Sequence, residues 1–221
     1  MAFFGAFVTF PIFVMSPRDL REMLRTVIVA LGDSTTAGTP GWQSPLEYPP
    51  DGRGDETSQY AWWLMQRRAD WEVLNRGVNG ERSDEIRARM ERDVIAAAPR
   101  AVVIIAGVND IYQGREPAHV TSQLRAMYDR ALDAGLIVVA GTIVPYNTAT
   151  PMQNERMREV NAWIRSRSDP GRIAFADTRA AVARPDDQDL LLESPDGLHP
   201  SPDGYRRMAE ALAPVLERLL R

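Results

Sequence analysis

The chain has 221 residues, of which 44% are hydrophobic and 25% are charged, a size and composition that fit a globular protein with a substantial buried core. The formal net charge of −4 argues against a nucleic-acid-binding protein, and the absence of cysteine excludes disulfides, thiolate catalysis and cysteine-ligated metals. Only two histidines are present, His119 and His199, so a three-histidine metal site is excluded and any catalytic histidine is one of these two.

Residues 1–25 are predicted to form an apolar extension with a short helix, ahead of a single domain at 26–221. The apolar run at 2–15 is too short for a membrane span, and Pro11 interrupts it. It also lacks the basic start and the cleavage site of a signal peptide. We therefore expect a cytoplasmic protein without a stable membrane span, while a secreted or periplasmic location is left open.

Three interpretations of this extension are considered. It is a packed or partner-contacting segment, an interfacial anchor, or upstream sequence that a start at Met15 or Met23 would omit. We favour the first, which includes a homo-oligomer formed through the extension.

Five short apolar runs rich in β-branched residues are predicted to be strands: 26–31, 71–74, 101–106, 136–140 and 172–176. Helices are predicted between and after them, at 59–69, 83–97, 116–134, 151–168 and 202–220. This alternation predicts an α/β fold with a five-stranded parallel sheet covered on both faces, and right-handed crossovers make it a three-layer α/β/α sandwich.

The segment 39–58 is rich in proline, glycine and aspartate, and it is predicted to be a long surface loop. It directly follows the turn after the first strand. Because long loops in compact domains are often functional, we expect this one to form a wall of the functional site.

The first three predicted strands each end in a polar turn that contains glycine. These turns are Gly32-Asp33-Ser34, Asn79-Gly80 and Gly107-Val108-Asn109-Asp110. In a parallel sheet they converge on one edge, where they would together supply a serine nucleophile and oxyanion donors. Taken singly, each has a simpler explanation: Ser34 would cap a helix, and Asn109 would stabilise a turn.

The C-terminal region contains Asp196-Gly197-Leu198-His199 in a turn bounded by proline. With this spacing the Asp196 carboxylate can orient the His199 imidazole toward a hydroxyl group. His119 lies in the first turns of a predicted helix, and we expect it to be a solvated surface residue. Asp33 and Asp110 are expected to hold their turns through backbone amides.

Together these motifs resemble the SGNH hydrolase superfamily, also called GDSL esterases and lipases. The resemblance runs from residue 27 to the C-terminal helix, and its four blocks occur in order: Gly32-Asp33-Ser34 with Gly38, Asn75 to Gly80, Gly107-x-Asn109-Asp110 and Asp196-x-x-His199. It implies a flavodoxin-like sheet and hydrolysis of esters or thioesters without a cofactor or metal. Residues 1 to about 22 are additional to the family pattern.

The resemblance also implies residue roles. Ser34 would be the nucleophile, His199 the general base, and Asp196 the residue that orients His199. The backbone N–H groups of Ser34 and Gly80 and the side-chain amide of Asn109 would form the oxyanion hole. Gly80 fits the family pattern better than Gly77. Ile111, Tyr112, Pro145 and Tyr146, which follow the third and fourth strands, are predicted to line the acyl pocket.

We therefore predict a serine esterase that acts on small to medium acyl esters, with a small-molecule ester as its partner. The alternatives are a thioesterase or lysophospholipase, a carbohydrate deacetylase, and more remotely a binding or membrane-docking protein without catalysis. The triad is common to all the enzymes, so the loops at 39–58 and 145–151 are expected to decide the substrate.

Overall fold

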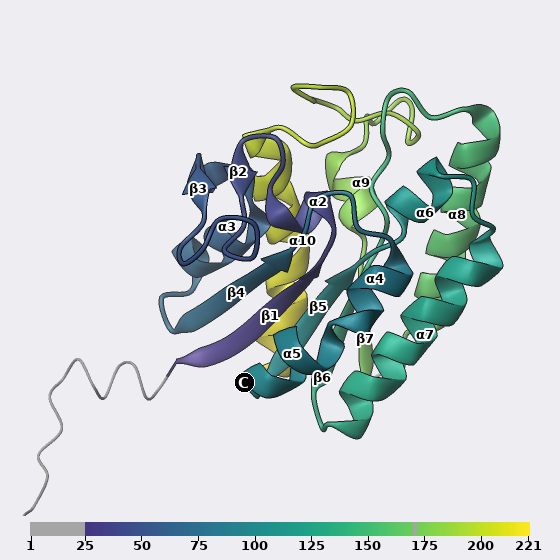
Figure 1. The fold of residues 1–221 in the computed structure, drawn as a ribbon. Helices are drawn as coiled ribbons and strands as arrows, with labels where there is room; N and C mark the ends of the chain where they lie inside the picture. The colour runs from purple at the N-terminus through teal and green to yellow at the C-terminus, as the bar shows by residue number, and fades with distance from the viewer. Residues whose placement is uncertain (1–24, 170–171) are drawn as a thin grey trace, which may run out of the picture.

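The protein is described by a computed structural model, which covers residues 25–169 and 172–221 (Figure 1). The predicted apolar extension and its short helix lie outside these residues. Residues 170 and 171, which follow the helix predicted at 151–168, lie outside them as well.

The centre of the fold is a five-stranded parallel sheet in the order β4-β1-β5-β6-β7. The strands span Thr26–Gly32 (β1), Trp71–Gly77 (β4), Ala101–Ile105 (β5), Ile137–Gly141 (β6) and Ile173–Ala176 (β7). The chain runs from β1 outward to β4 and then back across β1 to β5, which is the flavodoxin-like order. The predicted strands and the predicted fold class are confirmed.

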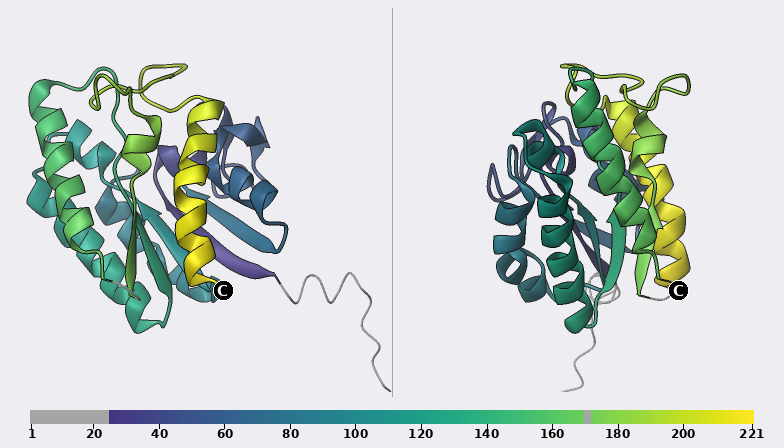
Figure 2. Two further views of the ribbon diagram at one scale, coloured as in Figure 1. Left: turned by 180° about the vertical axis from the view of Figure 1, so that it is seen from behind. Right: turned by 90° about the vertical axis from the view of Figure 1, so that its right-hand side faces the viewer.

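Helices cover both faces of the sheet, as the end-on view shows (Figure 2). One face carries α4 (Ser83–Ala88), α5 (Met90–Asp93), α7 (Pro117–Asp133) and α8 (Pro151–Ser166). The other carries α3 (Tyr60–Arg67), α9 (Thr178–Val182) and α10 (Pro202–Leu219). The short helices α2 (Ser34–Ala37) and α6 (Val108–Tyr112) directly follow β1 and β5.

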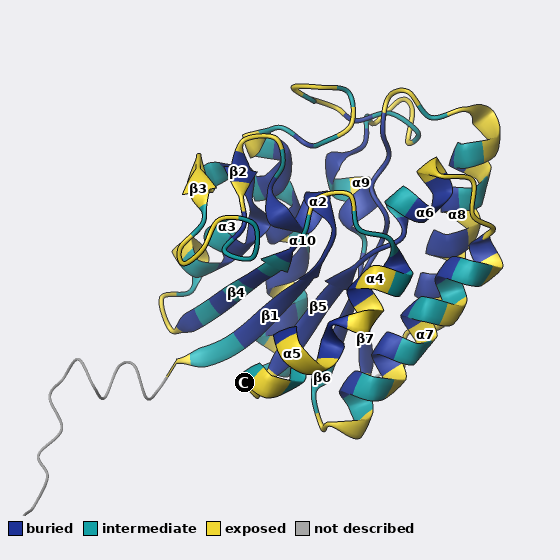
Figure 3. Ribbon diagram, in the orientation of Figure 1, coloured by how far each residue is buried: buried dark blue, intermediate teal, exposed yellow. Residues whose placement is uncertain are grey.

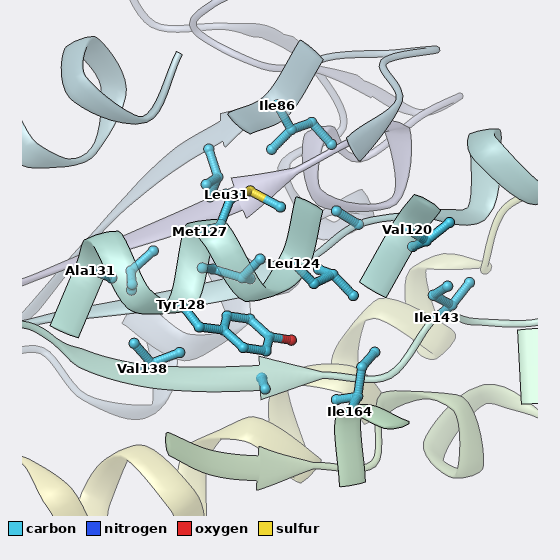
Figure 4. Close-up of a cluster of buried hydrophobic side chains, with 14 of the residues drawn as sticks. Leu31, Ile86, Val120, Leu124, Met127, Tyr128, Ala131, Val138, Ile143 and Ile164 are labelled. Atoms are coloured by element: carbon cyan, nitrogen blue, oxygen red, sulfur yellow. The ribbon is translucent and has the colours of Figure 1, made fainter. Parts of the chain in front are cut away.

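Alternating side chains of each strand divide the core into two layers. Val29 and Leu31 of β1 pack toward α4 and α7, whereas Ile28 and Ala30 pack toward α3 and α10. Figure 4 shows the first layer, in which Leu31 of β1 lies near Met127 of α7 and Ile86 of α4. Since both faces are covered, the central strands are mainly apolar, and β5 is apolar and buried along its whole length.

Two predicted elements differ from the structure. The helix expected at 83–97 is divided into α4, α5 and a 3₁₀ turn at Ile95–Ala97, with the first break at Arg89, where the backbone leaves helical geometry. The loop expected at 39–58 contains a two-stranded antiparallel ribbon, β2 (Trp42–Gln43) with β3 (Arg53–Gly54), and a 3₁₀ turn at Glu56–Ser58.

The burial pattern separates the sheet from the loops at its carboxyl edge (Figure 3). The strands are largely buried, while the loops that follow β6 and precede α10 are exposed in many places. Within residues 25–169 and 172–221, no helix is long and apolar enough to cross a bilayer.

Candidate active site

Ser34 occupies the first position of α2, directly beyond the carboxyl end of β1. Asp33 caps this short helix, since its Oδ1 accepts a hydrogen bond of 3.0 Å from the Thr35 amide. Gly32 allows the turn to lie close to the sheet, because a Cβ there would come within 2.3 Å of the Ile105 carbonyl oxygen. The strand end therefore holds Ser34 in a buried turn, where it is only 5% exposed.

Asp196 and His199 lie in the loop that precedes α10, and we call residues 194–199 the His199 loop. Asp196 Oδ1 accepts hydrogen bonds of 2.9 Å from the amides of both Leu198 and His199. Ser194 Oγ donates to the His199 carbonyl over 2.6 Å and accepts from the Gly197 amide over 2.8 Å. Short-range bonds thus fix this loop, and Gly197 supplies the left-handed backbone (φ +79°) at its turn.

The three predicted side chains meet in a line. Ser34 Oγ lies 3.0 Å from His199 Nε2, and His199 Nδ1 lies 2.7 Å from Asp196 Oδ2. A proton on Nδ1 that is held by the carboxylate leaves Nε2 free to accept a proton from the serine hydroxyl. The fold therefore brings together, across 165 residues of sequence, a hydroxyl, an imidazole and a carboxylate in the geometry of an activated nucleophile.

Burial and hydrogen bonding act in opposite directions on the Asp196 carboxyl. Partial burial raises its pKa, but the hydrogen bonds from the His199 ring and from the amides of Leu198 and His199 outweigh it and hold the pKa below its usual range. Asp196 is therefore an anion at neutral pH and can stabilise a protonated His199.

The predicted oxyanion donors Gly80 and Asn109 lie in the turns that follow β4 and β5. Gly80 has a φ of +80°, and no heavy atom lies within 4 Å of the position that a Cβ would take, so the space on that side of the residue is open. Asn109 is the second residue of α6, and its Nδ2 donates a 2.9 Å hydrogen bond to the Glu81 carbonyl. We refer to Gly32–Ser34, Asn79–Glu81 and Gly107–Asp110 as the strand-end turns.

Residues that the sequence analysis did not single out support these turns. Glu47 accepts hydrogen bonds from the amides of Ser44 (3.0 Å) and Asn79 (2.8 Å), and Ser44 Oγ donates to the Gly77 carbonyl over 2.6 Å. At the His199 loop, the backbone N–H of Asn147 donates a hydrogen bond of 2.7 Å to the Gly197 carbonyl. These long-range partners carry no local sequence signal, because their roles depend on segments that meet only in the fold.

A pocket of about 170 Å³ opens at the Ser34 and His199 side chains. Its wall is formed by residues from the strand-end turns, α6, the loop after β6 and the His199 loop: Ser34, Thr35, Asn79, Val108, Asn109, Tyr112, Tyr146, Leu198 and His199. The Tyr112 and Tyr146 rings meet edge to face with centroids 5.8 Å apart. The wall therefore combines apolar and aromatic side chains with polar ones, among them Ser34 and His199.

Three predictions about the pocket need correction. Ile111 is fully buried in the hydrophobic core because it lies on the inner face of α6. Pro145, which directly precedes Tyr146, is buried and does not line the described pocket. Tyr112 and Tyr146 do line it. No residue of 39–58 belongs to the pocket wall described here; this segment instead supports the turn at Asn79 from behind.

His119 is not the solvated surface residue that the sequence suggested. Its side chain is 30% exposed, and its buried Nε2 lies 3.7 Å from Asp110 Oδ1, because α7 packs against α4 and α6 follows directly from β5. Asp110 is fully buried and accepts hydrogen bonds of 2.8 Å from both the amide and the Oγ of Ser83. Ser83 is the first helical residue of α4 and follows the cap, Arg82.

Asp84, Asp110 and His119 are the one group within the described parts of the chain whose side-chain atoms converge as metal ligands could, within 4.8 Å of one another. Both Asp110 oxygens accept hydrogen bonds from Ser83, which ties the turn that contains Asn109 to the start of α4.

The comparison with known proteins decides the family. The profile of the GDSL-like lipase/acylhydrolase family matches residues 30–207. The chain belongs to this family. Its members hydrolyse carboxylic esters, so the predicted enzyme class is confirmed at this level.

Relatives and solved structures agree with this assignment. An arylesterase of Vibrio mimicus is 27% identical over 199 residues, covering 87% of this chain and 89% of its own. Esterase TesA of Pseudomonas aeruginosa is 27% identical over 76% of this chain and 83% of its own. The structure of a lipolytic protein of the G-D-S-L family from Desulfitobacterium hafniense superposes with a TM-score of 0.71 at 27% identity, over 87% of this chain and 100% of that one.

Proposed function

We propose that this GDSL-family protein is a serine esterase that hydrolyses small to medium acyl esters through a covalent acyl-enzyme. The observation that carries the proposal is the hydrogen-bonded line from Ser34 Oγ to His199 Nε2 (3.0 Å) and from His199 Nδ1 to Asp196 Oδ2 (2.7 Å). This arrangement supplies a nucleophile, its base and the residue that orients the base.

In acylation, Ser34 Oγ bonds to the ester carbonyl carbon while its proton passes to His199 Nε2. The tetrahedral intermediate collapses, the bond to the alcohol oxygen breaks, and His199 returns the proton to the leaving alcohol. Water then attacks the acyl-enzyme with His199 as base, which releases the acid and restores the serine. Throughout, the ionised Asp196 stabilises the imidazolium form of His199.

The carbonyl oxygen that becomes negative in this reaction needs donors in place before the substrate arrives. We assign this role to the backbone N–H groups of Ser34 and Gly80 and to the side-chain amide of Asn109. The places of Ser34 and Asn109 in the pocket wall support the assignment, and so does that of Asn79, which directly precedes Gly80.

The pocket favours small acyl or aryl groups. Its volume of about 170 Å³ is below the range of about 300–1,000 Å³ that is typical of sites for drug-sized ligands. The aromatic pair Tyr112 and Tyr146 and the side chain of Leu198 offer apolar contacts to such a group.

A carbohydrate deacetylase is the second candidate. An acetylxylan esterase of Geobacillus stearothermophilus is 26% identical over 63% of this chain and 69% of its own length. Acetyl is a small acyl group of the size that the pocket favours, so the choice depends on the alcohol side of the substrate. A panel of p-nitrophenyl esters of graded length, acetylated sugars, acyl-CoA and lysophospholipid separates these candidates.

The test of the proposed chemistry is the Ser34→Ala variant with p-nitrophenyl acetate. We expect its hydrolysis to fall by at least about 10³-fold, because the nucleophile is lost while the pocket remains. A folded Ser34→Ala protein that hydrolyses the ester at the wild-type rate would contradict the proposal.

A further inference from the structure

Arg89 stands at the break between α4 and α5, and its side chain is 6% exposed. Its guanidinium donates four hydrogen bonds to three separate segments of the chain. The acceptors are the Gly32 carbonyl (2.8 Å), the Arg76 carbonyl (2.8 Å), Glu81 Oε2 (2.7 Å) and Asp93 Oδ2 (2.9 Å). Such a buried cation is tolerated only when its donors are satisfied in this way.

Two of these acceptors belong to the strand-end turns. Gly32 directly precedes Asp33 and Ser34 in the turn after β1, and Glu81 directly follows Gly80 in the turn after β4. A single planar group therefore fixes the distance between the serine turn and the turn that presents the Gly80 amide.

Glu81 extends the connection to the third turn. Its side chain accepts from Arg89 Nε, while its main-chain carbonyl accepts the 2.9 Å hydrogen bond from Asn109 Nδ2. Asn109 thus takes its orientation from a residue that Arg89 holds. Arg89 is absent from the pocket wall described above, so it acts on the site through these partners.

The fourth acceptor lies outside the strand-end turns. Asp93, on α5, is 3% exposed and also accepts hydrogen bonds from the exposed Arg92. Burial raises the pKa of Asp93, but the hydrogen bonds from Arg92 and Arg89 outweigh it and hold the pKa below its usual range. Arg89 therefore donates hydrogen bonds both to the strand-end turns and to Asp93, with which it forms a purely structural ion pair.

We infer that Arg89 is a positioning residue that sets the oxyanion hole by holding Glu81, and through it the Gly80 amide and the Asn109 side chain, in register with Ser34. The inference rests on the proposed serine esterase function. A lysine cannot replace this residue, because one ammonium group lacks the planar fork that reaches acceptors on three segments.

The most direct test changes Glu81, since its side chain is partly exposed and its loss leaves the Arg89–Asp93 pair intact. We expect Glu81→Ala to lower kcat for p-nitrophenyl acetate by about 10–100-fold, with KM changed less than about twofold, because the donors act on the transition state. Glu81→Gln keeps an acceptor for Arg89 Nε and is expected to recover most of this loss.

Asp93→Asn is the matched control, because it changes the acceptor of the same guanidinium that lies outside the strand-end turns. We expect it to lower the urea midpoint of unfolding while kcat stays within about twofold of wild type. Inhibition by phenylboronic acid, whose tetrahedral adduct on serine places an oxygen in the hole, gives a second readout. Its affinity is expected to fall with kcat in Glu81→Ala and to be retained in Asp93→Asn.

Wild-type kcat in folded Glu81→Ala would overturn the inference, and so would equal losses of kcat in Glu81→Ala and Asp93→Asn. Failure of the proposed function is recognised separately, because the wild-type protein would then form no covalent adduct at Ser34.

Discussion

The two halves of the candidate site are held in different ways. The strand-end turns are tied by long-range hydrogen bonds through buried side chains, among them Arg89 and Asp110. The His199 loop is held mainly by bonds within residues 194–199, and the Asp196 side chain is 32% exposed. One half belongs to the core of the domain, whereas the other is a local turn placed on its edge.

This difference separates stability from chemistry. Substitutions in the His199 loop should change the reaction with little effect on folding, because few buried groups lose partners. Substitutions beneath the strand-end turns should change both, because they leave buried polar groups unsatisfied.

The largest effect is expected in the exposed half, from Asp196→Asn. The neutral amide cannot stabilise imidazolium and can hold His199 in the wrong tautomer, so kcat/KM should fall by about 10²–10⁴-fold. The thermal midpoint should stay within a few degrees of wild type. A large fall in the midpoint, measured by circular dichroism, would show that the His199 loop contributes to the stability of the core, as the strand-end turns do.

Next in size is the pH dependence of stability that Asp33 introduces. Burial raises the pKa of Asp33 from 3.8 to about 7, so the folded state holds this proton more tightly than the unfolded chain. The contribution of Asp33 to stability is therefore full below about pH 4 and is lost as pH rises to about 7, by at most roughly 4 kcal/mol.

The variant Asp33→Asn keeps a helix-capping oxygen and removes this titration. Urea unfolding of both proteins at pH 5 and pH 8 measures the difference. We expect the variant to gain stability relative to wild type as pH increases. A difference that is the same at both pH values would contradict the buried carboxyl account.

A smaller effect is expected for Asp110→Ala in the buried half. The substitution leaves the amide and the hydroxyl of Ser83 without their acceptor, which should cost about 3 kcal/mol of unfolding free energy. Ser83→Ala removes only the hydroxyl bond and should cost about 1 kcal/mol. Equal costs in urea titrations would mean that the amide bond contributes little to the link between α4 and α6.

The smallest effect is expected for Ser194→Ala. The loss of the short-range bonds of Ser194 Oγ within the His199 loop should reduce kcat/KM by about 10-fold or less, with an unfolding free energy within about 1 kcal/mol of wild type. A kcat/KM equal to wild type would show that Asp196 and Asn147 alone fix the loop.

Much of the fold follows from the sequence, because its signals are local and repeated. The all-apolar run at 101–106 predicts a central strand. Ser201 with Pro202 predicts the start of α10, where Ser201 Oγ accepts a hydrogen bond from the Gly204 amide. The polar turns after three successive strands place Ser34, Gly80 and Asn109 on one edge, since parallel strands end together.

Other features depend on packing that the sequence does not display. Arg89 is one of 26 basic residues in the chain, and nothing around it marks the one whose side chain passes beneath the ends of β1 and β4. Ile111 and Tyr112 are neighbours, yet the orientation of α6 buries the first and leaves the second at the pocket. His119 meets Asp110 only because α7 packs against α4.

The central claim is that Ser34 is the nucleophile activated by His199 and Asp196. It is tested most directly by treating the folded protein with a fluorophosphonate and locating the adduct by peptide mass spectrometry. We expect one adduct per chain, on Ser34, with loss of p-nitrophenyl acetate hydrolysis in proportion to labelling. An adduct on another residue, or full labelling that leaves the hydrolysis intact, would contradict the account.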